Sequence, residues 1–178
     1  MNMKLSIPEK ILILTLCMAG FLLLSQCGKE KKSPAGMAPD FTLHTLDGQE
    51  ITLSQLRGRV VLLDFWATWC APCRESIPHL IQLYGNYREK GLELIGMDLD
   101  KGDVETVRKF VRSMDIPYPI VVAPDDVARS YRVTSIPATI LIDKEGNLRE
   151  RIAGFSDTVA QELPRKVAEL TSEKSNPP

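Results

Sequence analysis

The sequence predicts an α/β domain in which helices cover both faces of a central mixed β-sheet. Apolar runs and amphipathic segments alternate along the 178-residue chain, a pattern typical of strands joined by helices. The run 60–66 contains valine, leucine and aromatic residues and a single carboxylate, Asp64, as expected for a strand buried on both faces. The chain closes with a predicted hairpin and a helix, so the sheet is expected to be mixed.

The predicted elements begin with a hairpin whose strands lie at 41–43 and 51–53. Asp47-Gly48 lies between them, a dipeptide that favours a tight turn. The remaining elements are expected in this order: a helical turn at 54–57, a strand at 60–66, a helix at 74–90 that Pro78 should kink, a strand at 92–97, a helix at 103–114, a strand at 119–122, a helix at 125–131, a strand at 136–143, a strand at 148–153 and a helix at 157–170.

The N-terminal part of the chain differs in composition from the rest. Residues 1–26 combine a basic start with a short apolar stretch, which is typical of a secretory signal peptide. The apolar stretch, 11–24, is shorter than the ~20 residues that a membrane-spanning helix needs. Residues 39–171 form the predicted globular domain, and 172–178 form a polar tail.

Residues 27–38 are predicted to be a flexible tether, because they are rich in glycine, lysine, serine and proline. The preceding Leu24-Ser25-Gln26 and Cys27 resemble a bacterial lipobox, although Gln26 departs from the usual small residue. Cys27 is therefore the predicted lipidation site; the alternative is an uncleaved or conventionally cleaved segment with an incidental cysteine. On either interpretation the domain is exported. Lipidation of Cys27 would attach it to a membrane, facing the periplasm or another extracytoplasmic space.

Charge argues against nucleic-acid binding, and cysteine content argues against a domain stabilised by several disulfides. The chain has 22 Lys and Arg residues against 23 Asp and Glu, so it lacks the basic patch that nucleic-acid binding requires. Of the four cysteines, Cys17 and Cys27 lie in the N-terminal segment, and Cys70 and Cys73 form one Cys-x-x-Cys pair. Because no cysteine remains for a disulfide framework, the domain must be stabilised by a hydrophobic core.

The cysteine pair lies where a predicted strand passes into a predicted helix, a context that favours redox chemistry. Cys70 is expected just before the first helical turn, where free backbone N–H groups and the helix dipole stabilise a thiolate. Cys73 is three residues further on, on the same helical face and deeper. We therefore predict that Cys70 attacks a substrate disulfide and that Cys73 resolves the mixed disulfide. No cofactor is expected.

Two other interpretations of the pair are open. A structural disulfide across so short a loop contributes only about 2 kcal/mol in the chain-entropy model. A zinc site needs further ligands, and His44 and His79 do not have zinc-like spacing. Both histidines are interpreted as surface residues, and no metal site is predicted.

Asp64 is a third candidate catalytic residue. Burying a carboxylate in an apolar strand costs several kcal/mol unless it is paired or protonated. Burial also raises the pKa of a carboxyl group toward the range where it can transfer protons. We predict that Asp64 accepts the proton of Cys73, through water, during resolution. The alternative is a carboxylate at the strand end that reaches solvent.

The segment 64–73, together with Ser135-Ile136-Pro137 and Gly154, resembles the thioredoxin superfamily. The opening 38–43, the hairpin after it and the N-terminal anchor make the chain similar to membrane-anchored TlpA/ResA-type oxidoreductases over about 38–171. The resemblance implies a thioredoxin fold with an N-terminal β-hairpin and an inserted helical segment at about 102–124.

The resemblance also implies a substrate-binding groove. It implies that the peptide bond between Ile136 and Pro137 is cis, which would place that backbone beside Cys70, where it could pair with a substrate strand. Gly154 lines the same groove. Trp69 and Pro72, which flank Cys70 in the motif, are assigned to substrate binding as well.

Two positions depart from the family pattern. Many relatives carry glutamate where this chain has Ser76, and thioredoxin pairs its buried aspartate with a lysine where this chain has Gly96. Proton transfer is therefore expected to depend on Asp64 alone.

The activity implied by the resemblance is reduction of disulfides in exported proteins, with apo-cytochrome c the commonest substrate among relatives. A transmembrane electron donor of thiol type would reduce the enzyme again. One alternative is a peroxiredoxin-like thiol peroxidase, although the Pro-x-x-x-Thr-x-x-Cys signature of that group is replaced at Leu63 and Ala67. Another is a tethered binding or chaperone-like module whose cysteines are incidental.

Overall fold

The computed structural model describes residues 36–174. The predicted signal peptide, most of the tether, the predicted lipidation site Cys27 and the last four residues of the tail lie outside this range. Within it, no helix combines the length and the apolar character needed to cross a membrane.

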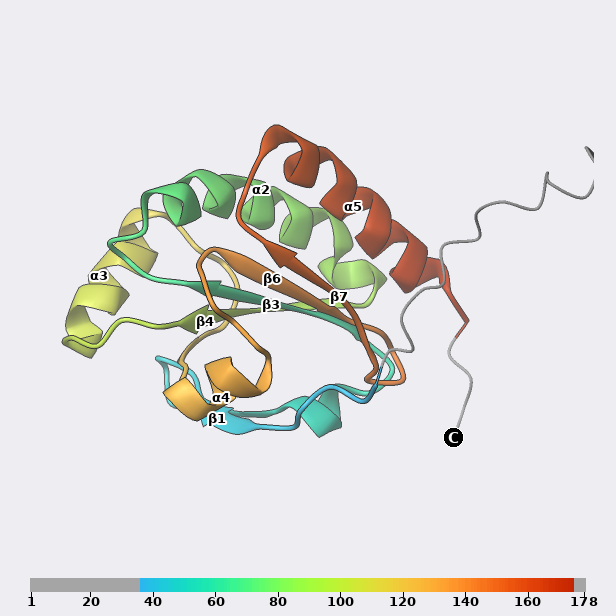
Figure 1. Cartoon of the computed structure of the whole chain (residues 1–178), viewed down its shortest axis with the longest axis horizontal. Coiled ribbons are helices and arrows are strands. Elements are labelled where there is room, and N and C mark those ends of the chain that lie inside the picture. The colour runs from blue at the N-terminus through green and yellow to red at the C-terminus, as the bar shows by residue number, and fades with distance from the viewer. Residues whose placement is uncertain (1–35, 175–178) are drawn as a thin grey trace, which may run out of the picture. The chain divides into compact units, whose positions relative to one another are not determined.

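The elements follow the predicted order (Figure 1). They are β1 (Thr42–His44), β2 (Glu50–Thr52), β3 (Val60–Trp66), α2 (Ala71–Tyr87), β4 (Leu92–Asp98), α3 (Val104–Ser113), β5 (Ile120–Val122), α4 (Asp125–Ser130), β6 (Ala138–Ile142), β7 (Leu148–Ala153) and α5 (Asp157–Ser172). Short 3₁₀ helices at Leu53–Leu56 and Arg88–Lys90 complete them.

Five strands form one sheet in the order β5-β4-β3-β6-β7. Strands β3, β4 and β5 are parallel to one another, and β6 is antiparallel to both of its neighbours. This arrangement confirms the predicted mixed sheet. In the register, Asp64 on central strand β3 lies opposite Gly96 on β4 and Thr139 on β6.

Helices cover both faces of the sheet, as Figure 1 shows. Alternate residues of β3 point to opposite faces. Leu62 and Trp66 join a buried cluster that includes residues of α2, α3 and α5, among them Cys73, Ile77, Val107, Leu163 and Val167. Leu63 and Phe65 join a second cluster with α4 and the hairpin region, which includes Phe41, Leu53, Ala128 and Tyr131.

The N-terminal hairpin covers the free edge of β5. Its strands pair antiparallel, with Thr42 opposite Thr52, and Gly48 in the turn has a φ of 83° that favours glycine. Thr45 bridges Val121, and the Leu46 N–H donates to the Ile120 carbonyl (2.8 Å between nitrogen and oxygen). An exposed strand edge is an aggregation risk, and the hairpin reduces that exposure.

Most boundaries differ from the sequence-based expectation by one or two residues, and two differences involve a proline. Helix α2 begins at Ala71 rather than at residue 74, because Pro72 suits the first helical turn. It then runs to Tyr87 with Pro78 inside it. Strand β6 begins only at Ala138, since the preceding proline has no N–H for the ladder. The segment 102–124 contains the helix α3 and the strand β5, as the sequence predicted.

The turn between β6 and β7 holds both ends of the described chain. The Leu148 N–H donates to the Gly36 carbonyl (3.0 Å), and the Ala38 N–H donates to the Gly146 carbonyl (2.9 Å). The Lys144 ammonium donates to the carbonyls of Thr171 and Glu173 at the end of α5 (2.7 Å each). Residues distant in sequence are thus joined at one corner of the sheet.

Candidate active site

The two cysteines form a disulfide at the start of α2. Their sulfur atoms are 1.99 Å apart and their Cα atoms 5.3 Å apart. Cys70 is the N-cap residue, and its sulfur accepts a hydrogen bond from the Cys73 N–H (3.3 Å). Cys70 retains 5% of its exposure and Cys73 none. The outer sulfur therefore lies over the N-terminal turn of the helix, where a thiolate would be stabilised.

Asp64 lies on the face of β3 that α2 covers. Side-chain alternation places it between Leu62 and Trp66, whose cluster contains both cysteines. Its exposure is 1%, which excludes the alternative of a carboxylate that reaches solvent. Within residues 36–174, neither of its carboxyl oxygens has a hydrogen-bond partner. Burial raises the pKa of Asp64 from 3.8 to about 7, so its carboxyl group can exchange a proton near neutral pH.

Gly96 offers Asp64 no side chain to pair with, and apolar and aromatic side chains surround it. A Cβ atom at Gly96 would lie 2.4 Å from Cδ1 of Ile120, 3.1 Å from Nε1 of Trp66 and 3.5 Å from a ring carbon of Tyr118. Burial, and secondarily the charge of Asp64, raise the pKa of the Tyr118 hydroxyl well above its usual range. The position of the lysine in thioredoxin is therefore filled by apolar and aromatic side chains.

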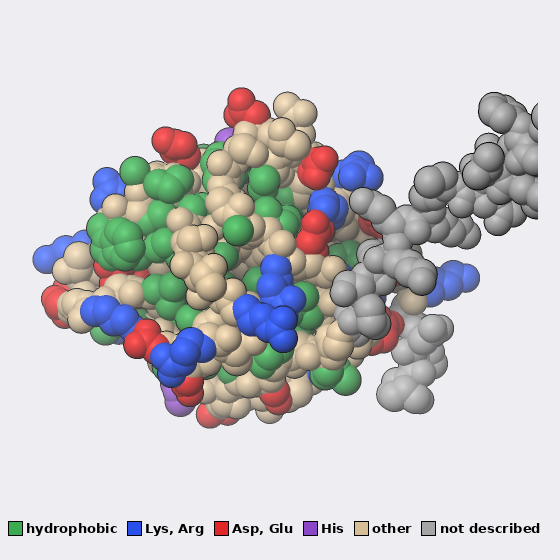
Figure 2. Space-filling view, viewed as in Figure 1, with side chains coloured by type: hydrophobic (Ala, Val, Ile, Leu, Met, Phe, Trp, Pro, Cys, Tyr) green, Lys and Arg blue, Asp and Glu red, His purple; other side chains and the backbone are tan. Residues whose placement is uncertain are grey.

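The predicted substrate-binding residues differ in exposure. Trp69 is 68% exposed, and Pro72 is exposed in the first turn of α2. The Ile136–Pro137 peptide bond is cis, and the Gly154 N–H donates to the Pro137 carbonyl (2.8 Å). Ile136 packs against the cluster that contains both cysteines. On the face seen in Figure 2, hydrophobic side chains gather toward the end where β3 runs into α2.

His79, for which the sequence suggested no role, lies close to the residues of the predicted groove. Its ring is 5.2 Å from that of Phe155, centroid to centroid. It lines a small hollow together with Ser76, Pro137, Thr139, Gly154 and Phe155. The Ser76 hydroxyl donates to the Cys73 carbonyl (2.9 Å) and so contacts the backbone of the inner cysteine.

Sequence reasoning missed a pair of carboxylates at the end of β4, Asp98 and Asp100. Asp98 is fully buried, and its Oδ2 has no hydrogen-bond partner within 36–174. Burial, and then the neighbouring Asp100, raise the pKa of Asp98 to about 7. Asp100 accepts hydrogen bonds from Thr68, two residues before Cys70. The available signal was two aspartates directly after a buried strand.

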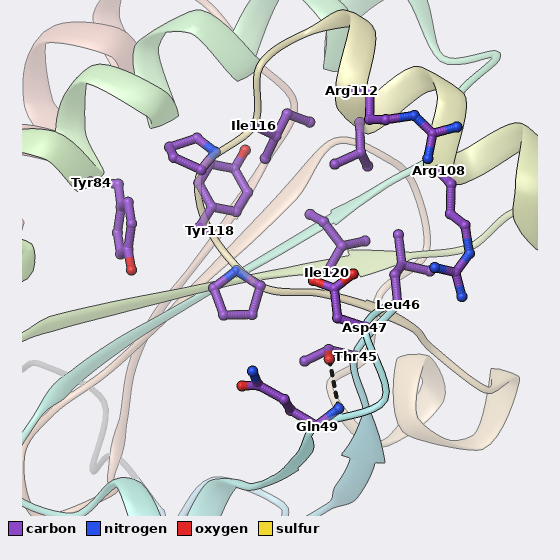
Figure 3. Close-up of a pocket in the computed structure, with 13 residues that line it drawn as sticks. Thr45, Leu46, Asp47, Gln49, Tyr84, Arg108, Arg112, Ile116, Tyr118 and Ile120 are labelled. Carbon is purple, nitrogen blue, oxygen red and sulfur yellow. Dashed lines mark hydrogen bonds between the residues drawn. The ribbon is translucent and has the colours of Figure 1, made fainter.

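A separate cavity of about 410 Å³ lies between the hairpin turn, α3 and the segment before β5 (Figure 3). The rings of Tyr84 and Tyr118 meet edge to face in its wall, with centroids 5.8 Å apart. Arg108 and Arg112 also line it, and both pair with Glu105 (3.8 and 2.8 Å). Neither cysteine lines this cavity. Within 36–174 no cluster of three or more His, Cys, Asp or Glu residues could hold a metal ion.

The sequence matches one protein-family model and is similar to known oxidoreductases. The model of the AhpC/TSA family matches residues 34–151. A thiol-disulfide oxidoreductase ResA of Bacillus cereus is 38% identical over 148 residues, which cover 81% of this chain and 85% of that protein. ResA of Bacillus subtilis (strain 168) is 32% identical over 154 residues, covering 85% and 86%.

The fold is also similar to solved structures of thiol:disulfide interchange proteins. A Chlorobium tepidum protein described as the thiol:disulfide interchange protein DsbE superposes with a TM-score of 0.73 at 30% identity, covering 79% of this chain and 99% of that one. A thioredoxin-family thiol:disulfide interchange protein from Chlorobium tepidum TLS superposes with a TM-score of 0.71 at 26% identity, with the same two coverages.

Proposed function

This chain belongs to the AhpC/TSA family and is a thiol-disulfide oxidoreductase of ResA type, and from that premise we propose that it reduces disulfides in exported proteins. The observation that carries the proposal is the Cys70–Cys73 disulfide at the N-terminus of α2. A pair in this position can exchange two electrons with a substrate without a cofactor.

The proposed reaction begins with the reduced pair. The Cys70 thiolate attacks one sulfur of a substrate disulfide, forms a mixed disulfide and releases the other substrate sulfur as a thiolate. Cys73 then passes its proton to Asp64 through water and attacks the Cys70 sulfur. The products are the Cys70–Cys73 disulfide and a second substrate thiol, so the substrate gains two electrons. Two observations support Asp64 as the proton acceptor. It is buried on the face of the sheet that α2 covers, and its carboxyl oxygens have no hydrogen-bond partner among residues 36–174.

Trp69, Pro72, Ile136, Pro137 and Gly154 are proposed to bind the substrate. The exposure of Trp69 supports this role, since a large exposed aromatic ring beside a reactive sulfur can pack against a partner. The hydrogen bond between Gly154 and Pro137 supports it too, because it holds two of these residues together.

The location and partners are proposed from the N-terminal sequence and the family. The composition of residues 1–38 supports export, lipidation at Cys27 and attachment to a membrane. Apo-cytochrome c is the substrate we would test first, and a transmembrane thiol-type carrier is the proposed electron donor.

Reduction of insulin by the protein tests the activity. Replacing Cys70 by serine should abolish reduction, whereas activity that persisted unchanged would refute the redox role of the pair and favour a binding module. The reduction potential tests the direction, because values in this superfamily range from about −270 to −120 mV. A potential near the oxidising end of that range would contradict the reductant assignment.

A thiol peroxidase is the second candidate, since the AhpC/TSA family model matches the chain. Leu63 and Ala67 occupy the signature positions around the peroxidatic cysteine of that group. Full peroxide turnover by a Cys73→Ser variant would favour the peroxidase. Capture of exported proteins as mixed disulfides by Cys73→Ala would favour the reductase and identify its substrates.

A further inference from the structure

We propose that Asp100 and Arg74 are positioning residues that hold Thr68 from two sides and thereby fix the segment that carries Trp69 and Cys70. We call these three side chains and their hydrogen bonds the Thr68 clamp. The proposal rests on the thiol–disulfide exchange described above and assigns residues to it that lie outside the Cys-x-x-Cys motif and the groove.

Every polar group of Thr68 is bound by a side chain from another element. Its N–H donates to Oδ2 of Asp100 (2.7 Å), and its hydroxyl donates to Oδ1 of the same carboxylate (2.9 Å). Its carbonyl accepts from Nε and Nη2 of Arg74 (2.9 and 2.6 Å). Hydrogen bonds to charged groups are stronger than those between neutral groups. Three of these four bonds involve the N–H or the carbonyl of Thr68, so they restrain its backbone on both sides.

The clamp acts directly on the segment that presents the attacking sulfur. The Cys70 N–H donates to the Ala67 carbonyl (3.1 Å), so Thr68 and Trp69 form the two inner positions of a tight turn. The Cys70 carbonyl accepts from the Arg74 N–H (3.2 Å), which joins this turn to the first turn of α2. Movement of Thr68 would therefore move the Cys70 sulfur away from the helix N-terminus.

Arg74 is itself oriented by the inserted helix α3. Its guanidinium carbon lies 5.5 Å from the centre of the Phe110 ring, a distance suited to a cation–π contact. Phe110 in turn stacks on Trp66 at the end of β3, with ring centroids 5.2 Å apart and an interplanar angle of 30°. The inserted segment thus contributes to the redox site from outside the cysteine motif.

Replacing Asp100 has two opposite effects on the pH at which Cys70 ionises, one through its charge and one through the position of Cys70. Removing a negative charge near Cys70 would by itself stabilise the thiolate and lower the pH at which Cys70 ionises. Releasing the turn would move the sulfur out of the helix N-terminal field and raise that pH. Asp100→Asn removes the charge and retains a side chain that can bond both the N–H and the hydroxyl of Thr68. Asp100→Ala removes both.

The experiment measures alkylation of Cys70 by iodoacetamide as a function of pH, in the full-length reduced protein. The same variants are assayed for the second-order rate constant of insulin reduction. If the clamp positions Cys70, Asp100→Ala raises the pH midpoint and lowers the rate constant by about 10- to 100-fold, as small misplacements of reacting groups do. Asp100→Asn lowers the midpoint slightly and keeps most of the rate. The proposal would be overturned if the pH midpoint fell equally in Asp100→Ala and Asp100→Asn, or if the rate constant of Asp100→Ala were unchanged.

A second pair of variants leaves the charge unchanged and covers the case that Asp100→Ala does not fold. Thr68→Val loses only the hydroxyl bond, and its rate constant should fall at least about twofold. Thr68→Ser retains that bond and should match the wild type in rate and midpoint. Equal behaviour of valine and serine would overturn the proposal.

Arg88→Ala serves as the control for Arg74→Ala, because Arg88 follows the far end of α2 and pairs with its neighbour Glu89 (3.2 Å). The Arg74 variant should lose activity and the Arg88 variant should not; equal rates would contradict the clamp. A wild-type protein that reduces no disulfide would instead refute the proposed function, while the alkylation profiles would still test the clamp.

Discussion

Replacing Asp64 by asparagine should remove a pH dependence of stability that the buried carboxyl group imposes on the fold. The pKa of Asp64 rises from 3.8 to about 7 because the group is buried. In the unfolded chain the same group ionises near 3.8. Between these two values the unfolded state has lost a proton that the native state retains, so the free energy of unfolding falls as pH rises.

The size of the effect follows from the two pKa values. Each unit of difference corresponds to about 1.4 kcal/mol, so the shift costs the native state about 4 kcal/mol above pH 7. Below pH 3.8 both states are protonated and the cost disappears. The wild type should therefore lose up to about 4 kcal/mol relative to Asp64→Asn as pH rises from 4 to 8, with no further change above.

Urea unfolding of the oxidised wild type and variant at closely spaced pH values measures this difference. The subtraction is essential, because burial also raises the pKa of Asp98 to about 7 and gives both proteins a similar trend of their own. A difference that stayed constant from pH 4 to pH 9 would refute the assigned pKa. If Asp64 is also the proton acceptor, the variant should resolve mixed disulfides more slowly from pH 6 to 9; equal rates there would contradict that role.

Three further predictions concern packing, helix capping and substrate contact. Gly96→Val should destabilise the protein by about 1–3 kcal/mol, because its Cβ would lie 2.4 Å from Cδ1 of Ile120, 3.1 Å from Nε1 of Trp66 and 3.5 Å from the Tyr118 ring, so its two methyl groups would crowd both rings; an unchanged chemical-denaturation midpoint would contradict this close packing. Ser156→Ala should cost about 1 kcal/mol in the same measurement, since the Ser156 hydroxyl accepts from the Val159 N–H at the start of α5, and Ser156→Asp should retain most of the stability. Trp69→Ala should raise KM for a protein disulfide without changing the alkylation rate of Cys70, because the ring is exposed and belongs to neither buried cluster; an unchanged KM would exclude Trp69 from substrate binding.

Local sequence patterns predicted the helices and strands, because the conformation of each segment depends strongly on residues close to it in the sequence. The unbroken apolar run predicted β3, and Asp47-Gly48 predicted the first hairpin. The position of Gly96 opposite Asp64 followed from the family resemblance, and the register confirms it. Within 36–174 neither carboxyl oxygen of Asp64 has a hydrogen-bond partner.

The contacts around Thr68 could not be predicted in this way. Asp100 lies 32 residues from Thr68 in the sequence, and the two meet only because β3 and β4 are parallel neighbours that end at the same edge of the sheet. The stacking of Phe110 on Trp66 likewise depends on how α3 packs against the sheet. Such contacts are set by tertiary packing, for which no local pattern exists.

The corner that joins Gly36 to Leu148 has a consequence for how the domain could be held. Val61 lies beside Ile142, so this corner adjoins the start of β3, whereas Cys70 follows its end. A pull on residue 36 would therefore be transmitted first to the turn between β6 and β7, at the opposite end of the sheet from the disulfide. The point of attachment adjoins the start of β3, and the cysteines follow its end. The domain could therefore be held at its N-terminal side while its cysteines remain free to react.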